Sequence, residues 1–294
     1  MELRVLQYFL TVAREETFSA AAEALHLSQP TLSRQIKDME DELGKQLLIR
    51  GGRKVTLTEE GMLLRKRAEE ILALAELARE EIRTAEDTLT GALHIGAGET
   101  EAVHFLTKAA RRLQAEHPQI RFHIISGDTT DVMEQLDRGL IDFGLLFDPI
   151  DLGRYDAIRL PAQDTWGVLM RRDSPLAAQS AVRAEDLWER PLIISRQATE
   201  SNSLSTWLRR DVAQLNIVGT YSLIFNASLM VQDGMGYALC LDGIINTTGD
   251  SALCFRPLTP ALQAGVNVVW KKYQILTRPA QRYLQELQSL QERP

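Results

Sequence analysis

A cluster of hydrogen-bonding side chains near residue 30 is the clearest candidate for chemistry in this sequence. The cluster comprises Gln29, Thr31, Ser33 and Arg34. Ser28, just before it, can cap a helix because its hydroxyl accepts a bond from a free backbone N–H, and Pro30 suits a first helical turn. Polar side chains at such a helix start can reach base edges and phosphates in the major groove of DNA. The spacing therefore predicts a helix that reads DNA.

The surrounding segments predict a small domain that positions this helix. Helical spacing or alanine-rich composition predicts helices at 2–14, 19–25 and 29–43, and strands are predicted at 47–50 and 54–57. The strands flank Gly51-Gly52 and bring together Arg50, Arg53 and Lys54, which favours phosphate contact over a solvated turn. Each phosphate neutralised adds about 0.9 to the salt slope of binding. Lys37, one turn beyond Arg34, faces either phosphate or solvent. Three helices and a basic hairpin are the winged form of a helix-turn-helix.

A long helix is predicted next, from about Thr58 to Asp87. Thr58 can cap it, and Glu59 and Glu60 suit the positive end of its dipole. Its apolar residues recur every three or four positions and form a narrow seam: Leu64, Ala68, Ile71, Ala75, Ala78, Ile82 and Ala85. The seam and the length favour pairing with a second copy over packing on the helix's own domain.

The remaining two-thirds of the chain alternates predicted strands and helices, which indicates parallel sheets covered by helices. Near Pro161 the chain enters a second lobe. A helix is predicted at 100–116, another at 203–214, and a strand at 166–170. Two such lobes leave a cleft at the carboxyl ends of their strands, where ligands bind in open α/β sheets.

Two strand-to-helix turns could line this cleft. Glu99 and Thr100 follow the first strand, and Asp128 and Thr129 follow the second. The first turn lacks the third glycine of a dinucleotide fingerprint. For each residue, capping or packing is as probable as ligand contact. Because the turns carry carboxylates and Arg196 is the clearest nearby cation, we predict a neutral, polyol-like or partly cationic ligand, or a carboxylate that Arg196 holds.

Composition and motifs argue against other classes of protein. The 294 residues suggest two or three domains, and a net charge of −7 disfavours attraction of the whole molecule to nucleic acid without excluding a basic face. Cys240 and Cys254 lie in apolar segments and are expected to be buried thiols. The five histidines lack metal-site spacing, and no nucleophile motif is present, so we expect no enzyme and no metal. Without a signal peptide or membrane-length apolar run, a soluble, cytoplasmic protein is expected.

The first sixty residues closely resemble the LysR-type transcriptional regulators. The resemblance rests on Leu3-Arg4, Tyr8-Phe9, residues 18–23 (FSAAAE), 27–36 (LSQPTLSRQI), 42–44 (ELG), 47–50 (LLIR) and 57–61 (LTEEG). Later residues fit more loosely, through the order of elements and the turns His117-Pro118 and Gly234-Met235-Gly236. The family wing more often has an aromatic residue near Ile49.

The resemblance implies an α/β multidomain protein with a winged helix-turn-helix, a long linker helix and a periplasmic-binding-protein-like sensor of two α/β subdomains. We assign these to 1–58 (helix-turn-helix about 18–37), 59–90 and 91–294, with subdomain I at about 91–161 plus 266–294 and subdomain II at about 162–265. Implied partners are double-stranded operator DNA, further copies of the chain in a dimer or tetramer, a small-molecule effector and RNA polymerase, with no cofactor and no membrane.

The resemblance also implies site residues. The DNA-binding set is Gln29, Pro30, Thr31, Ser33, Arg34, Lys37, Arg50, Arg53 and Lys54. The effector-binding set is Glu99, Thr100, Asp128, Thr129, Phe147, Arg196, Thr199, Ser201, Asn202, Phe225 and Asn226. A small-molecule-binding module whose amino-terminal part is only an oligomerisation arm is the alternative, and it would show no DNA sequence preference.

Overall fold

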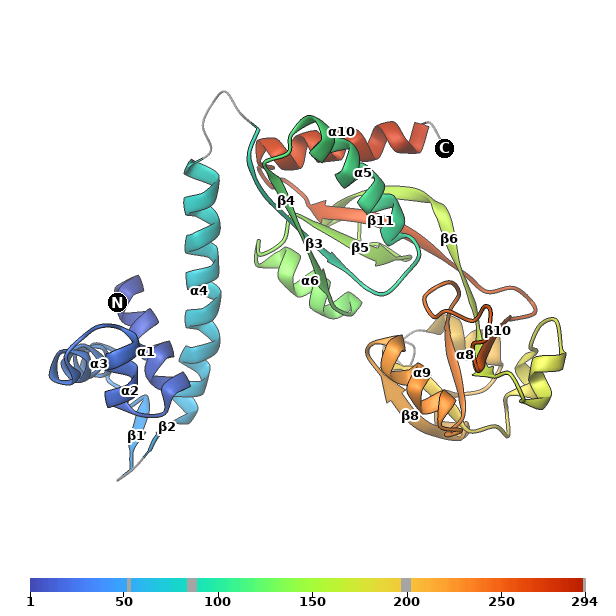
Figure 1. The fold of residues 1–294 in the computed structure, drawn as a ribbon, viewed down its shortest axis with the longest axis horizontal. Coiled ribbons are helices and arrows are strands. Elements are labelled where there is room, and N and C mark those ends of the chain that lie inside the picture. Colours follow the sequence, from blue (N-terminus) through green and yellow to red (C-terminus); the bar gives the residue numbers. More distant parts are fainter. Residues whose placement is uncertain (52–53, 84–88, 197–201, 293–294) are drawn as a thin grey trace. The chain divides into compact units, whose positions relative to one another are not determined.

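Helices and one short hairpin make up the beginning of the chain, and a mixed sheet with covering helices makes up the rest (Figure 1). The computed structural model describes residues 1–51, 54–83, 89–196 and 202–292. The chain divides into two units, Met1–Arg83 and Thr84–Pro294.

The first unit contains the predicted winged helix-turn-helix. Its elements are α1 (Leu3–Glu15), α2 (Phe18–Ala24), α3 (Gln29–Leu43), β1 (Leu48–Arg50) and β2 (Val55–Leu57). The β1 and β2 strands pair antiparallel. Phe9, Leu32 and Ile36 are fully buried where the three helices meet. Burial of this apolar stripe leaves the opposite side of α3 to solvent, because the helix repeats every 3.6 residues.

Local signals set both ends of α3. The Ser28 hydroxyl accepts a hydrogen bond from the Thr31 backbone N–H at 3.3 Å, and Pro30 lies in the first turn. Gly44 ends the helix in the left-handed conformation, with φ at +65°, which glycine adopts without steric cost. The predicted range of 29–43 is therefore confirmed.

The long helix α4 (Glu59–Arg83) packs on the rest of the first unit through part of its seam. Ala68 is fully buried there, whereas Ile71 and Leu74 are 36% and 39% exposed and Ile82 is 85% exposed. The helix starts close to β1, since a Cβ added at Gly61 would lie 2.1 Å from the Leu47 carbonyl oxygen. Residues 84–88, where the predicted helix was to end, lie outside the described residues.

The second unit is built on a nine-stranded sheet (Figure 1). Its buried apolar residues form four clusters. Lobe I consists of β3 (Gly91–Ala97), α5 (Val103–Glu116), β4 (Ile120–Ser126), α6 (Thr129–Asp137), β5 (Phe143–Phe147) and α10 (Arg278–Glu292). The β3 strand pairs parallel with β4 and β5. Tyr283 of α10 and Phe143 of β5 are fully buried in its core.

Lobe II follows along the chain. It consists of β7 (Leu192–Ser195), α8 (Asn202–Leu208), β8 (Ile217–Tyr221), α9 (Ile224–Gln232), β9 (Tyr237–Leu241), β10 (Leu253–Pro257) and the short 3₁₀ turns η1 (Pro175–Ala178), η2 (Ala184–Asp186) and η3 (Val212–Gln214). Two long strands, β6 (Tyr155–Arg171) and β11 (Gln263–Lys271), join the lobes and pair antiparallel.

Several sequence predictions are corrected here. The sheet is mixed instead of parallel, because β6 and β11 carry the chain between the lobes in opposite directions. The β6 strand extends well before the predicted start at 166, and β10 was not predicted. The helix predicted at 100–116 begins at Val103, since Thr100 to Ala102 form a turn before it. The helix predicted at 203–214 is divided into α8 and η3.

Candidate functional site

The start of α3 presents the predicted polar side chains on its outer side. Gln29, Pro30, Thr31, Arg34 and Lys37 are exposed, and Ser33 is partly buried; Leu32 and Ile36 are the buried residues on the other side. The Ser19 hydroxyl of α2 donates to the Gln29 side chain at 3.1 Å. The structure therefore brings the α3 residues of the DNA-binding set together on one surface.

The Arg34 guanidinium is extended into solvent. Its side chain is 82% exposed, and its ion pair with Asp38 spans 3.9 Å between Nε and Oδ2. Exposed pairs of this kind stabilise a helix by only a few tenths of a kcal/mol. The guanidinium can therefore exchange Asp38 for another anion at little cost in stability.

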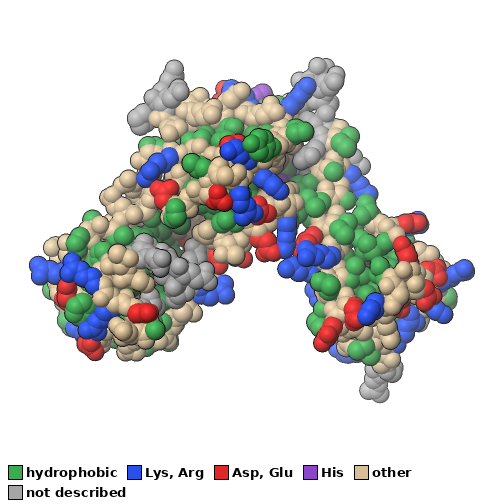
Figure 2. Space-filling view, turned by 180° about the vertical axis from the view of Figure 1, so that it is seen from behind, with side chains coloured by type: hydrophobic (Ala, Val, Ile, Leu, Met, Phe, Trp, Pro, Cys, Tyr) green, Lys and Arg blue, Asp and Glu red, His purple; other side chains and the backbone are tan. Residues whose placement is uncertain are grey.

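The wing cations lie in different surroundings. Lys54 forms an ion pair with Glu16 at the end of α1. Arg53 lies outside the described residues. Figure 2 shows Lys and Arg interspersed with Asp and Glu over the visible surface. The described cations Arg34, Arg50 and Lys54 thus each lie next to an acidic side chain of the first unit.

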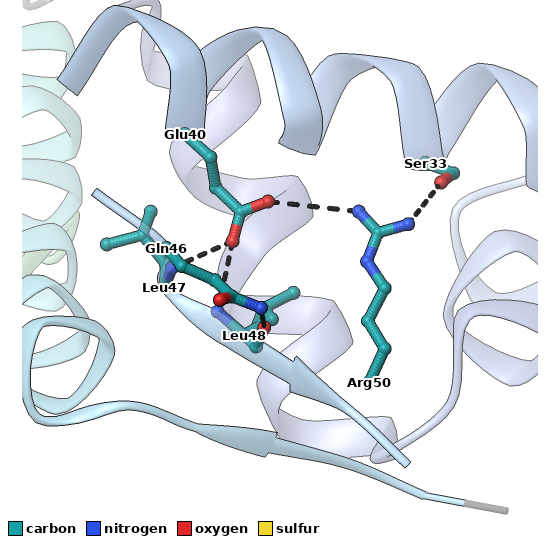
Figure 3. A network of polar contacts seen from close by, with 6 residues as sticks. All are labelled: Ser33, Glu40, Gln46, Leu47, Leu48 and Arg50. Atoms are coloured by element: carbon teal, nitrogen blue, oxygen red, sulfur yellow. Dashed lines mark hydrogen bonds and ion pairs between the residues drawn. The ribbon is translucent and has the colours of Figure 1, made fainter. Parts of the chain in front are cut away.

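The Arg50 side chain is 44% exposed and contacts Ser33 and Glu40 of α3 (Figure 3). It donates to the Ser33 hydroxyl at 3.1 Å and lies 3.8 Å from the Glu40 carboxylate. Its guanidinium carbon lies 4.8 Å from the centre of the Phe18 ring. Glu40 was missed in the sequence because it reads as one more acidic residue on a helix surface.

Next to these contacts lies an open hollow of about 580 Å³, lined by Lys37, Glu40, Asp41, Gly44, Lys45, Gln46 and Arg50. It separates the second half of α3 from the approach to β1. Its lining carries both signs of charge: Lys37, Lys45 and Arg50 are cationic, and Glu40 and Asp41 are acidic.

In the second unit, the first predicted turn of lobe I is joined to β6. The Thr100 hydroxyl donates to the Asp164 carboxylate, and it accepts from the Ala102 backbone N–H at 3.0 Å. Thr100 and Asp164 are 8% and 5% exposed. Burial is the main cause that raises the pKa of Asp164 above its ordinary value. Asp164 was not predicted, because a single acid within an apolar strand shows no local motif.

Glu99 and Asp128 both contact lobe II. The Glu99 carboxylate accepts from the Ile224 backbone N–H at the start of α9. Asp128 caps α6 by accepting from the Asp131 N–H at 2.9 Å, as the capping interpretation predicted, and its carboxylate lies 3.9 Å from the Arg196 guanidinium. Both acidic turns of lobe I therefore meet groups of lobe II.

The other predicted effector residues are dispersed around this junction. Thr129 is the first residue of α6, Phe147 is partly buried against the lobe I core, and Phe225 and Asn226 are exposed at the start of α9. Asn202 begins α8, while Thr199 and Ser201 lie outside the described residues. The Asp148 carboxylate, which follows Phe147, accepts from the Asn267 amide at 2.8 Å and pairs with Arg159 at 3.1 Å.

In the part of the chain that the structure describes, no three His, Cys, Asp or Glu side chains are grouped so that they could hold a metal ion. Within the same residues, no helix has the length and apolar character needed to cross a membrane.

Comparison with known proteins covers both units. Residues 3–62 match the bacterial regulatory helix-turn-helix proteins of the lysR family, and residues 86–291 match the LysR substrate binding domain. The chain is 32% identical over 289 residues to the Hca operon transcriptional activator HcaR of Escherichia coli strain K12, covering 96% of this chain and 95% of that protein. It is 31% identical to the transcriptional activator IlvY of Salmonella typhimurium strain LT2, covering 84% and 85%.

Solved structures show the same fold. CbnR, a LysR family transcriptional regulator, superposes with a TM-score of 0.78 at 19% identity, covering 99% of both chains. Full-length CbnR in complex with its target DNA gives a TM-score of 0.77 at 20% identity, covering 98% of this chain and 99% of that chain. From the matches to both parts of the chain and the relatives that span it, the protein belongs to the LysR family of bacterial transcriptional regulators.

Proposed function

We propose that this regulator reads an operator in double-stranded DNA through the exposed side of α3 and responds to a small molecule bound between lobes I and II. The observation that carries the DNA half is the capped, solvent-facing start of α3, with Gln29, Thr31 and Arg34 on one surface. A helix presented this way enters the major groove, where base edges are distinguishable. Arg34 can bond to a guanine edge or to a phosphate.

The supporting contacts come from the rest of the predicted DNA-binding set. Pro30 and Ser33 lie on the same turns of α3, and Lys37 and Lys54 supply charge for phosphates. Arg53 completes the wing in this proposal. The domains that we propose are 1–58 for DNA binding, 59–90 for pairing and 91–294 for effector binding.

A gel-shift experiment tests the DNA contact. The probe is DNA from upstream of the chain's own gene, and the variants are Arg34→Ala and the control Arg4→Ala. Arg4 is also an exposed arginine beside an acidic side chain, with 66% of its side chain exposed and Glu2 at 3.3 Å. Arg34→Ala should weaken specific binding by about 10- to 100-fold, as expected for loss of a base or phosphate contact. Equal binding by wild type, Arg34→Ala and Arg4→Ala would contradict the proposal.

The exposed part of the α4 seam supports self-association. Ile71 and Ile82 of the seam, together with Leu74 beside it, leave apolar surface uncovered in the single chain, and a second copy of the helix could bury it. We propose a dimer or tetramer that places two recognition helices in successive major grooves. Sedimentation of Ile71→Asp should show a smaller species than wild type, and an unchanged species would contradict pairing through this seam.

The junction of the lobes supports an effector that is neutral, polyol-like or partly cationic, or a carboxylate held by Arg196. Glu99 and Asp128 place two carboxylates there, next to α9 and Arg196. An added anion would be repelled unless it pairs with Arg196, since like charges in one site disfavour each other. The remaining candidates Thr100, Thr129, Phe147, Thr199, Ser201, Asn202, Phe225 and Asn226 complete the proposed site.

Calorimetric titration with a panel of neutral, cationic and dicarboxylate metabolites tests the ligand class. A dicarboxylate that still binds tightly to Arg196→Ala would refute it. A ligand that binds one arrangement of the lobes better shifts the population toward it, and we propose that this changes how the DNA-binding domains are placed. In this proposal the protein acts in the cytoplasm, catalyses no reaction and contacts RNA polymerase at the promoter.

A further inference from the structure

Arg50 is the point where three elements of the first unit meet. It lies on β1, donates to Ser33 of α3 at 3.1 Å, and stacks over Phe18, the first residue of α2. Its distance to the Glu40 carboxylate, also on α3, is 3.8 Å. Ser33 and Glu40 are about two helical turns apart and so lie on the same side of α3. The arginine side chain thus spans a face of the recognition helix (Figure 3).

Glu40 completes the arrangement from the other side. One of its carboxylate oxygens accepts from the backbone N–H groups of Leu47 and Leu48, at 2.7 and 3.1 Å. The other oxygen faces Arg50. The Glu40 side chain is only 12% exposed, so its two oxygens are shared between β1 and Arg50 with little competition from water. The two bonds to the backbone N–H groups are charge-assisted and therefore among the stronger ones, whereas the 3.8 Å contact with Arg50, whose side chain is 44% exposed, is an ion pair without a hydrogen bond.

We propose that Glu40 and Arg50 are positioning residues for DNA binding, forming a brace that sets the wing against the recognition helix and orients Ser33. Because the Ser33 oxygen accepts from Arg50, its own O–H is kept as a donor for another group. Ser33 then offers a proton to an acceptor on DNA, such as a phosphate oxygen or a guanine edge. This assigns Arg50 a task other than that of a phosphate ligand, and it rests on the proposed DNA contact by α3.

Two conservative changes break the brace without removing the fold's main contacts. Arg50→Lys keeps the positive charge, but a single ammonium lacks the planar fork that reaches Ser33 and Glu40 together. Glu40→Gln keeps the size and one acceptor oxygen for Leu47 and Leu48, and its NH₂ group then faces the donors of Arg50. Asp41→Asn is the matched control, an exposed acid one residue further along α3 that lines the same hollow.

The experiment measures binding to two probes as a function of salt. One is a duplex that the wild-type chain selects from a random-sequence pool, and the other is a scrambled duplex of equal length. Arg50→Lys and Glu40→Gln should each weaken binding to the selected duplex about tenfold, the effect expected when a charge-assisted bond is lost. For both variants, binding to the scrambled duplex and the salt slope should stay near the wild-type values. The control Asp41→Asn should bind both duplexes as wild type does. Circular dichroism melting checks that the variants are folded; Arg50→Lys leaves the Glu40 bonds to β1 intact.

The double variant decides between a brace and two separate contacts. Glu40→Gln/Arg50→Lys should bind the selected duplex about as well as the weaker single variant, because the two residues act through one interaction. Additive losses would overturn the proposal. The proposal would also be overturned if Arg50→Lys binds with wild-type affinity while Arg50→Ala lowers the salt slope by about 0.9 on both probes. This pair of results would identify Arg50 as a phosphate ligand. If the wild-type chain selects no duplex, the proposed DNA contact itself fails.

Discussion

Replacement of Asp142 by asparagine should make the second unit more stable near neutral pH. The Asp142 carboxylate precedes β5 and accepts from the His94 backbone N–H at 2.8 Å. Its side chain is 14% exposed. Burial, opposed by this hydrogen bond, raises the pKa of Asp142 to about 6 from its ordinary 3.8. The folded protein therefore contains a carboxylate that is costly to ionise.

The magnitude follows from the change in pKa. A rise from 3.8 to about 6 corresponds to about 3 kcal/mol at ~1.4 kcal/mol per unit. Between these values the folded state binds more protons than the unfolded state, so the free energy of unfolding falls as the pH rises. This loss of stability is fully present above the pKa of Asp142 in the folded state and absent below its pKa in the unfolded state. Asparagine keeps an oxygen for the His94 N–H and removes the charge.

Urea unfolding followed by tryptophan fluorescence measures the effect. All four tryptophans lie in the second unit, so their signal reports on that unit. Relative to wild type, the gain in stability of Asp142→Asn should grow from about 1 kcal/mol at pH 4.5 to about 3 kcal/mol at pH 7.5. Asp250→Asn, the same change at an exposed acid, should stay within about 0.5 kcal/mol. The argument would be refuted if the difference in free energy of unfolding between Asp142→Asn and wild type did not change with pH. It would also be refuted if Asp142→Asn were less stable than wild type at pH 7.5. Either result would indicate that His94, whose Nδ1 lies 4.0 Å from the Asp142 carboxylate, compensates its charge.

Three further outcomes follow from burial and charge. Leu32→Ala, at a fully buried site beneath the recognition surface, should cost about 2–5 kcal/mol, measured as a lower melting temperature of the first unit; a variant within 1 kcal/mol of wild type would contradict the packing. Lys54→Ala, at a wing lysine whose side chain is 70% exposed, should lower the salt slope of DNA binding by about 0.9 if it contacts phosphate, and an unchanged slope would exclude that contact. Burial raises the pKa of the Cys240 thiol to about 12, so iodoacetamide at pH 8 should label it only in urea; mass spectrometry that finds rapid labelling of the folded chain would show the thiol to be accessible.

Prediction from sequence succeeded best where a structure depends on neighbouring residues. Ser28 and Gly44 mark the ends of α3 because a cap bond spans three residues and a left-handed turn needs one glycine. The spacing of Leu32 and Ile36 showed which side of α3 would be buried, and thereby which side would carry Arg34. The polar surface proposed for DNA could thus be predicted almost entirely from one stretch of sequence.

The strand arrangement of the second unit could not be obtained in this way. Alternation of strands and helices predicts parallel pairing, and it holds for β3, β4 and β5 and for β7, β8 and β9. The long strands β6 and β11 read as ordinary elements, although each runs through both lobes. Their antiparallel pairing joins segments about a hundred residues apart. No local pattern in the sequence indicates which strand pairs with which.

By itself, the sequence determined the capped recognition helix, the basic hairpin and the two-lobed second unit, because helix caps, apolar periodicity and turn residues act over a few positions. Only the tertiary structure decided that Arg50 is held by Glu40 and Ser33, that Asp164 is buried against Thr100, and that Glu99 reaches the start of α9. The groups that meet in these contacts are separated by 10 to 125 positions. What each one bonds to depends on where the packing of apolar cores brings distant segments together, and that packing is a property of the whole chain.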